Sequence, residues 1–306
     1  MKKSNNIPAK IDSISELSRL MGVPKPVHPL IGFFDNTSIK VDVSQLPESL
    51  LLNFYKISYK FNQKGKMGYG QGYYDFDEGG MVFTAPYQLI TIPNEVVYEG
   101  FSLLFHPDFI RNYPIGQKIK QYGFFSYDTN EALHLSDKEK QQIFAVVESI
   151  KEELNNAIDA FSQDLIVSYI EVLLNYSNRF YKRQFITRKS VSHDLLTGME
   201  ELLNRYFDKD EGLQKGLPSV EFLAEQLNVS PRYLSDMLRS LTGQNAQQHI
   251  HEKLIEKAKE YLMSTQLSVA EIAYQLGFEH PQSFNKLFKR KTNLTPVAFK
   301  QSFQDN

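Results

Sequence analysis

The stretch SVAEIAYQLGF at residues 268–278 decides the fold of the C-terminal part of the chain. Ala273 is a small residue within a helical pattern, and Gly277, four residues later, tolerates a positive φ. A new helix is expected to begin at Pro281, because the first helical position does not need the N–H that proline lacks. A small residue, a left-handed turn and a second helix are typical of a helix-turn-helix motif.

The same pattern occurs 49 residues earlier in the chain. Ser219-Val220, Ala224 and Gln226-Leu227 recur as Ser268-Val269, Ala273 and Gln275-Leu276. In the earlier copy Asn228 takes the turn position and Pro231 begins the second helix. The repeat predicts two helix-turn-helix motifs joined by a helix from about Ala246 to Met263. That helix would be ~27 Å long, close to the ~34 Å between successive major grooves. One chain could therefore occupy two adjacent grooves.

The second helix of each motif has one apolar and one polar face. Leu234, Met237, Leu238 and Leu241 are predicted to face inward in the first copy, and Phe284, Leu287 and Phe288 in the second. The polar positions are candidates for DNA binding, because exposed residues on such a helix read base edges in the major groove. They are Arg232, Ser235, Asp236, Arg239, Gln282, Ser283, Asn285, Lys286, Lys289 and Arg290. The alternative, ordinary solvated faces, is disfavoured by the two matched copies.

Charge is balanced overall but not locally. The 306 residues include 34 Lys plus Arg and 36 Asp plus Glu, a formal net charge of −2, which argues against a polybasic protein. The segment 281–300 nevertheless contains five basic residues and no acidic residue. These are Lys286, Lys289, Arg290, Lys291 and Lys300. We expect this segment to face phosphates.

The N-terminal part has a different pattern. Short apolar runs between residues 32 and 127, separated by Gly and Pro, predict a barrel or sandwich of short strands. Ser136 and Glu139 form a capping box before a stripe of Ile143, Val147, Ile150 and Leu154, which predicts a helix. A second helix is expected from about Phe161 to Tyr181, and the pair either packs on the strands or forms a dimer interface. The polar stretch 182–192 is predicted to be a linker.

Five aromatic residues of the strand-rich region could line a small-molecule pocket: Tyr69, Tyr73, Phe83, Tyr87 and Tyr98. The alternative is that they are core and surface aromatics of ordinary strands. No catalytic or metal site is expected, since there is no Cys and His28, His106 and His134 are too scattered to form a ligand set. No cofactor is expected either. The chain shows no signal-peptide core and no spanning apolar run, so we expect a soluble, cytoplasmic protein without a membrane partner.

Residues 217–303 resemble the DNA-binding domain of the AraC/XylS family of bacterial transcription regulators. The resemblance is carried by residues 268–278, by Ser283-Phe284-Asn285-Lys286-Leu287-Phe288-Lys289 and by Leu294-Thr295-Pro296. It implies base-facing roles for Arg232, Ser235 and Asp236, and for Gln282, Asn285 and Lys286. Asp236 departs from the basic or amide residue often found there, and either accepts from a cytosine amino group or sets register. The strand-rich region is similar in layout to the cupin-like regulatory barrel of this family.

The expected fold class is therefore α+β. Residues 1–135 form a cupin-like regulatory, effector-binding barrel, residues 136–192 a helical dimerisation region and linker, and residues 193–306 an all-α domain with two helix-turn-helix motifs. The expected function is sequence-specific transcriptional regulation, with double-stranded DNA, a second copy of the chain and a small-molecule effector or regulatory partner as binding partners. The resemblance also allows contact with RNA polymerase. Two alternatives stay open: a metal-dependent cupin enzyme with a helical appendage, and a protein-interaction module that uses the helix-turn-helix as a scaffold.

Overall fold

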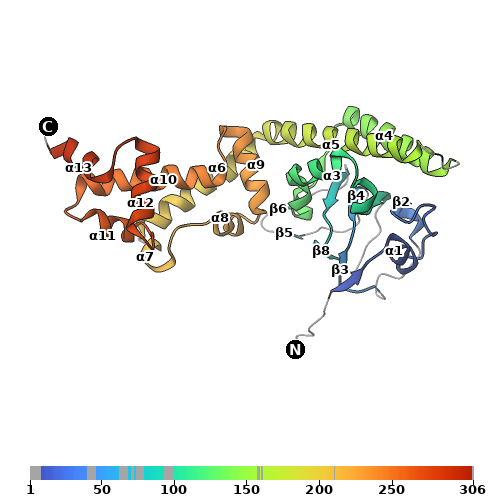
Figure 1. The fold of residues 1–306 in the computed structure, drawn as a ribbon, viewed down its shortest axis with the longest axis horizontal. Coiled ribbons are helices and arrows are strands. Elements are labelled where there is room, and N and C mark those ends of the chain that lie inside the picture. Colours follow the sequence, from blue (N-terminus) through green and yellow to red (C-terminus); the bar gives the residue numbers. More distant parts are fainter. Residues whose placement is uncertain are drawn as a thin grey trace. The chain divides into compact units, whose positions relative to one another are not determined.

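The computed structural model divides the chain into two compact units, Met1–Gln184 and Phe185–Asn306, called here the N-unit and the C-unit. Figure 1 shows that the strands belong to the blue-to-green part of the chain, whereas the orange-to-red part is helical. The structure describes residues 8–39, 46–61, 68–69, 72–73, 79–92, 99–156, 159, 161–209 and 211–304. The described part is thus a mixed α+β region followed by an all-helical region.

In the described part of the N-unit, the strands form two larger sheets and one short hairpin. The five-stranded sheet is antiparallel and has the order β10-β7-β4-β9-β2. Its strands are β2 (Ile31–Asp35), β4 (Tyr55–Phe61), β7 (Gly80–Thr84), β9 (Glu99–Phe105) and β10 (Leu133–His134). The three-stranded sheet contains β1 (Ala9–Ile11), β3 (Ser49–Leu52) and β8 (Leu89–Thr91), and the hairpin contains β5 (Gly68–Tyr69) and β6 (Gly72–Tyr73).

Strand β4 presents different residues on its two faces, because side chains alternate along a strand. Tyr59 packs edge-to-face on Phe144 of helix α4 (Asp137–Asn155), with ring centroids 5.0 Å apart. Lys56 and Ser58, on the other face, line a space shared with β8. The five-stranded sheet therefore lies between a helical layer and the three-stranded sheet.

The helices of the N-unit begin and end at recognisable caps. Ser13 caps α1 by accepting a hydrogen bond from the N–H of Glu16 (3.1 Å), and Ser136 and Glu139 form the predicted capping box of α4. The helices are α1 (Ile14–Leu20), α2 (Pro107–Ile110), α3 (Pro114–Lys118), α4 and α5 (Ser162–Thr187). Short 3₁₀ turns are η1 (Asn36–Ser38), η4 (Ile119–Gln121), η5 (Gly123–Ser126) and η6 (Thr129–Glu131).

The apolar stripe of α4 is buried within the N-unit. Ile143 and Ile150 have no exposed surface, and Val147 is 4 % exposed. Arg183 of α5 is paired with Glu139 of α4 (2.6 Å), which fixes the two helices together. Ile143, Val147 and Ile150 are therefore covered by other parts of the N-unit and are not available as a dimer surface.

The predicted linker at residues 182–192 is also wrong, since the structure there is helical. Helix α5 continues to Thr187 and α6 (Lys189–Asp208) begins two residues later. The stretch contains polar side chains with internal partners. Gln184 is 1 % exposed and its amide bonds to the backbone of Ala132 and His134. Polar composition alone could not show this burial.

The C-unit contains two copies of a three-helix arrangement after α6 and α7 (Glu211–Lys215). The copies are α8 (Val220–Gln226), α9 (Pro231–Thr242) and α10 (Ala246–Ser264), then α11 (Val269–Gln275), α12 (Pro281–Thr292) and α13 (Pro296–Gln304). Helix α10 packs against α6, α9, α11 and α13. Both predicted helix-turn-helix pairs and the connecting helix are therefore confirmed.

The turn of each motif is closed by the same backbone hydrogen bond. The N–H of Val229 donates to Ala224 (3.0 Å), and the N–H of Phe278 donates to Ala273 (2.9 Å). The residue before each donor has a positive φ, 54° at Asn228 and 94° at Gly277. Both alanines are buried, so a small side chain is required where the next helix crosses.

The residues buried on α9 and α12 are nearly all those predicted to face inward. Leu234, Met237 and Phe288 have no exposed surface. Leu241 was expected inside but is 36 % exposed, because it lies in the last turn of α9, which ends at Thr242 and is capped by Gly243.

Within the described residues, no helix has the length and apolar character needed to cross a membrane.

The Gly277→Ala substitution is expected to destabilise the C-unit by about 2–4 kcal/mol, because a β-carbon would overlap the carbonyl oxygen of Gly216 and would also require a left-handed alanine. The matched control is Gly243→Ala, where φ is also positive (80°) but nothing lies within 4 Å of the added carbon. This control should cost only about 1 kcal/mol. Urea unfolding of the full chain measures both, and equal losses would contradict the close-contact argument.

Candidate nucleic-acid interface

The start of α9 is fixed by a serine cap and a proline. The Ser230 side chain accepts a hydrogen bond from the N–H of Tyr233 (3.2 Å), and Pro231 occupies the first helical position. Arg232 follows directly and is exposed. The caps therefore place a cationic side chain in the first turn of the helix.

An ion-pair cluster covers the outer face of α9. The carboxylate of Asp236 accepts from Nε of Arg232 (3.0 Å) and from Nη1 of Arg239 (3.4 Å). The Asp236 side chain is 18 % exposed, whereas the two arginines are 47 % and 53 % exposed. Ser235 is half-buried. Asp236 is therefore placed to orient two arginines, which favours the register-setting role over direct contact with a cytosine.

Helix α12 has an outer face without carboxylates. Its six candidate residues, Gln282, Ser283, Asn285, Lys286, Lys289 and Arg290, are all exposed. Phe284 and Phe288 occupy the opposite face and are at most 1 % exposed. Among the described residues, no ion pair involves Lys286, Lys289 or Arg290. The α12 face thus carries uncompensated positive charge.

The end of α12 faces His251 of α10. Burial, together with the positive charges of Arg290 and Lys291, lowers the pKa of His251. The sequence did not place His251 near Arg290 and Lys291, because nothing short-range links it to residues about 40 positions later.

Lys300 was expected to face phosphates with the other basic residues of the segment. Instead, its Nζ donates to the carbonyl oxygens of Leu267 (3.0 Å) and Thr265 (3.4 Å). These carbonyls follow the end of α10, so Lys300 stabilises the junction between the two helix-turn-helix copies. The expectation for Lys300 is corrected on this ground.

Of the five residues predicted to line an aromatic pocket in the N-unit, the structure describes the side chains of two, Phe83 and Tyr87. Phe83 is 2 % exposed and packs on Phe124 with ring centroids 4.4 Å apart, as a core residue that also borders a pocket. Tyr87 is 57 % exposed in a turn with φ of 63°. Tyr98 and the side chains of Tyr69 and Tyr73 lie outside the described residues.

The geometry of the C-unit defines a tandem helix-turn-helix protein, and comparison with known proteins agrees. A helix-turn-helix domain family matches residues 223–302. The chain is 24 % identical over 258 residues to the uncharacterised HTH-type transcriptional regulator YfiF of Bacillus subtilis, covering 83 % of this chain and 79 % of that protein. It is 34 % identical over 79 residues to the transcriptional activator RhaS of Escherichia coli, covering 26 % of this chain and 28 % of that protein. Residues 223–302 therefore form an AraC/XylS-type helix-turn-helix domain, the DNA-binding domain of transcriptional regulators.

Solved structures give partial matches. The C-terminal domain of the response regulator yesN from Fusobacterium nucleatum is 32 % identical and covers 33 % of this chain and 96 % of that chain, with a TM-score of 0.29. ToxT from Vibrio cholerae is 16 % identical and covers 84 % of this chain and 92 % of that chain, with a TM-score of 0.31. The chain spans well under two thirds of RhaS. The family assignment therefore rests on the C-terminal sequence and its two motifs.

The Asp236→Asn substitution tests the ion-pair cluster. Without the carboxylate, Arg232 and Arg239 lose their common partner, and a negative charge leaves the face of α9. The two duplexes are a site selected from a genomic DNA pool and a scrambled version of it. We expect binding to the scrambled duplex to strengthen about two- to five-fold, while the preference for the selected site over the scrambled one falls about five-fold. Fluorescence anisotropy on both duplexes measures the two effects. Glu201→Gln removes a carboxylate from the exposed face of α6 and serves as the control. A loss of affinity for the selected site without any gain on the scrambled duplex would indicate that Asp236 contacts a base directly.

Proposed function

We propose that the C-unit reads base edges with the first turns of α9 and α12 and holds the phosphate backbone with the later basic residues of α12. One observation carries this proposal. Two recognition helices, each preceded by the same closed turn, present exposed polar side chains from the same early positions. Arg232 lies in one first turn, and Gln282 and Ser283 lie in the other.

Base reading and phosphate contact are expected from different residues. Arg232 and Lys286 lie in the N-terminal half of their helices, where side chains enter the groove, and both can donate to guanine O6 and N7. Lys289 and Arg290 follow in the last turns of α12, farther from the base edges. A protein that neutralises phosphates with such residues releases counterions, so its affinity falls with salt.

Replacing Arg232 or Lys286 with Ala is expected to cost about 1–3 kcal/mol on the preferred site and to relax preference at one or two base pairs. Arg290→Ala should instead weaken all duplexes alike and lower the salt slope by about one unit. Sites are first selected from a genomic DNA pool, and each variant is then titrated on preferred and scrambled duplexes at several salt concentrations.

The opposite pattern would overturn the placement of the helices. Arg290→Ala would then change base preference, while the other two variants changed only overall affinity. Absence of salt-dependent duplex binding by the intact protein would favour the protein-interaction module.

We further propose that the protein dimerises through the outer face of α5. Leu165 and Val172 are seven residues apart on this helix and remain 45 % and 40 % exposed. A seven-residue spacing places both side chains along one seam, as in paired helices. This face replaces the buried stripe of α4 as the candidate surface for a second copy of the chain.

The double substitution Leu165→Glu/Val172→Glu is expected to convert a dimer to a monomer without unfolding it, because both side chains are exposed and like charges would meet across the seam. Sedimentation velocity over a range of concentrations measures this. Ile150→Asp is the contrasting variant: it buries a charge at a position with no exposed surface and should reduce thermal stability instead. Sedimentation of the unsubstituted protein with the mass of a monomer at every concentration would exclude the dimer.

Control by a small molecule is the last part of the proposal. A pocket of about 240 Å³ lies between the two sheets, which we interpret as the interior of a cupin-like regulatory barrel. Its wall includes Lys56 and Ser58 of β4, Thr84 of β7 and Thr91 of β8. An effector held there would be coupled to DNA affinity by about 1–3 kcal/mol.

A further inference from the structure

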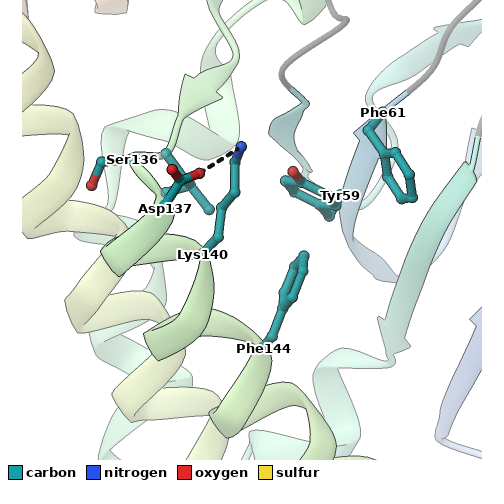
Figure 2. A pocket seen from close by; sticks show the side chains of 7 residues that line it. Tyr59, Phe61, Ser136, Asp137, Lys140 and Phe144 are labelled. Carbon is teal, nitrogen blue, oxygen red and sulfur yellow. Dashed lines mark hydrogen bonds and ion pairs between the residues drawn. The ribbon is translucent and has the colours of Figure 1, made fainter.

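A second and larger pocket lies on the opposite face of β4, toward the helical layer. Its volume is about 610 Å³, and it is bordered by the end of β4 and the first two turns of α4. Figure 2 shows the side chains that line it. They are Tyr59, Phe61, Leu135, Ser136, Asp137, Lys140 and Phe144. Neither the predicted aromatic pocket nor the space between the sheets includes this site.

Aromatic rings form one side of the pocket. Phe144 extends from α4 toward Tyr59, and the two rings meet nearly at right angles, 84° apart in plane. Tyr59 is 3 % exposed, but Phe144 remains 40 % exposed although it is a large apolar side chain. Phe61 continues the aromatic surface along β4, with its ring centroid 5.8 Å from that of Tyr59. A flat apolar group could stack or pack edgewise on this surface.

The position of Tyr59 is tightly defined by its neighbours. A β-carbon on Gly79 would overlap the Tyr59 hydroxyl group, and Gly79 has a positive φ of 82°, so the ring occupies space that only glycine leaves open. Burial, and secondarily the negative charge of Asp137, raise the pKa of Tyr59. The ring is therefore a neutral, fixed wall of the pocket.

A single lysine supplies the charge at the helical side. The Lys140 side chain is 25 % exposed, so its stem is largely covered, while its Nζ lies 3.5 Å from Oδ1 of Asp137. Asp137 is 94 % exposed, and an ion pair with such a solvated partner contributes little. Lys140 can therefore exchange this contact for an anion that enters the pocket, whereas Asp137 remains in solvent.

We propose that this pocket binds a small organic anion with a flat apolar body, whose ring lies against Tyr59 and Phe144 and whose carboxylate pairs with Lys140. Such a ligand would connect β4 to the first two turns of α4. The proposal does not depend on DNA binding, because it concerns a site within the N-unit and is measured on the protein alone.

The test uses 2-naphthoate as the probe and 2-naphthamide as its neutral counterpart of nearly the same shape. The protein contains no Trp, so naphthalene fluorescence can be followed without tryptophan emission. The full chain is expected to bind 2-naphthoate more tightly than 2-naphthamide. Lys140→Met, which keeps the stem and removes the charge, should weaken naphthoate binding about five- to ten-fold and leave naphthamide binding unchanged.

Two further variants separate charge from packing. Asp137→Asn should tighten naphthoate binding about two-fold or more, because the competing carboxylate is gone. Phe144→Ala should weaken both probes. Lys138→Met is the matched control, since Lys138 is an exposed lysine of the same helix outside the pocket lining, and it should change neither affinity. Hydrogen exchange should slow at the amides of residues 137–144 when naphthoate binds.

The proposal is overturned if wild-type protein binds neither probe. It is also overturned if Lys140→Met and Lys138→Met weaken the binding of 2-naphthoate equally, because that result would indicate a general attraction of anions to the helix. Equal affinity for the two probes would show an apolar pocket without anion selectivity and would overturn it as well. Circular dichroism of each variant confirms that the fold is retained before binding is compared.

Discussion

The direction of α9 and α12 relative to the helix that precedes each of them depends on one hydrogen bond in each turn. The bond runs from the N–H of the residue after the left-handed position to the carbonyl of a buried alanine. This bond satisfies a carbonyl at the end of the preceding helix, and it redirects the chain within three or four residues. The left-handed residue is Asn228 in one copy and Gly277 in the other. The difference has a physical reason, because the space beside Gly277 is occupied by the backbone of Gly216. A side chain is tolerated only in the first copy.

The two copies are alike in their turns but not in their spacing. Ser219 and Ser268 are 49 residues apart, whereas the prolines that begin α9 and α12 are 50 apart, so the second turn is one residue longer. The longer turn also changes the cap. Ser230 accepts a hydrogen bond at the start of α9, while the His280 side chain makes no such bond at the start of α12. The start of α12 therefore relies on Pro281 and on the packing of Phe284.

Short-range signals explain how much could be predicted from the sequence. The helix-turn-helix pairs, their caps and the connecting helix are encoded within a few residues, and the structure contains all of them. The N-unit depends on contacts between distant residues, so its strand-rich character was predictable while its details were not. The stripe at Ile143 and Ile150 shows that α4 has an apolar face, but periodicity cannot say what covers that face. Gln184 looks like a linker residue until its partners, 50 and 52 positions away, are known.

The candidate site shows the same limit at the level of single side chains. Helical spacing predicted which residues of α9 and α12 face outward, yet it could not show that Asp236 binds two arginines or that Lys300 bonds to carbonyl oxygens. These contacts make the two recognition helices electrostatically different. On α9 each arginine shares a carboxylate, so its charge is partly compensated and its direction constrained. On α12 the positive charges are uncompensated. Long-range attraction to phosphates depends on net charge, whereas selection among bases depends on the geometry of donors. In the arrangement that we propose, α12 is therefore the stronger anchor on phosphates, and α9 is the helix whose donors are better oriented in advance.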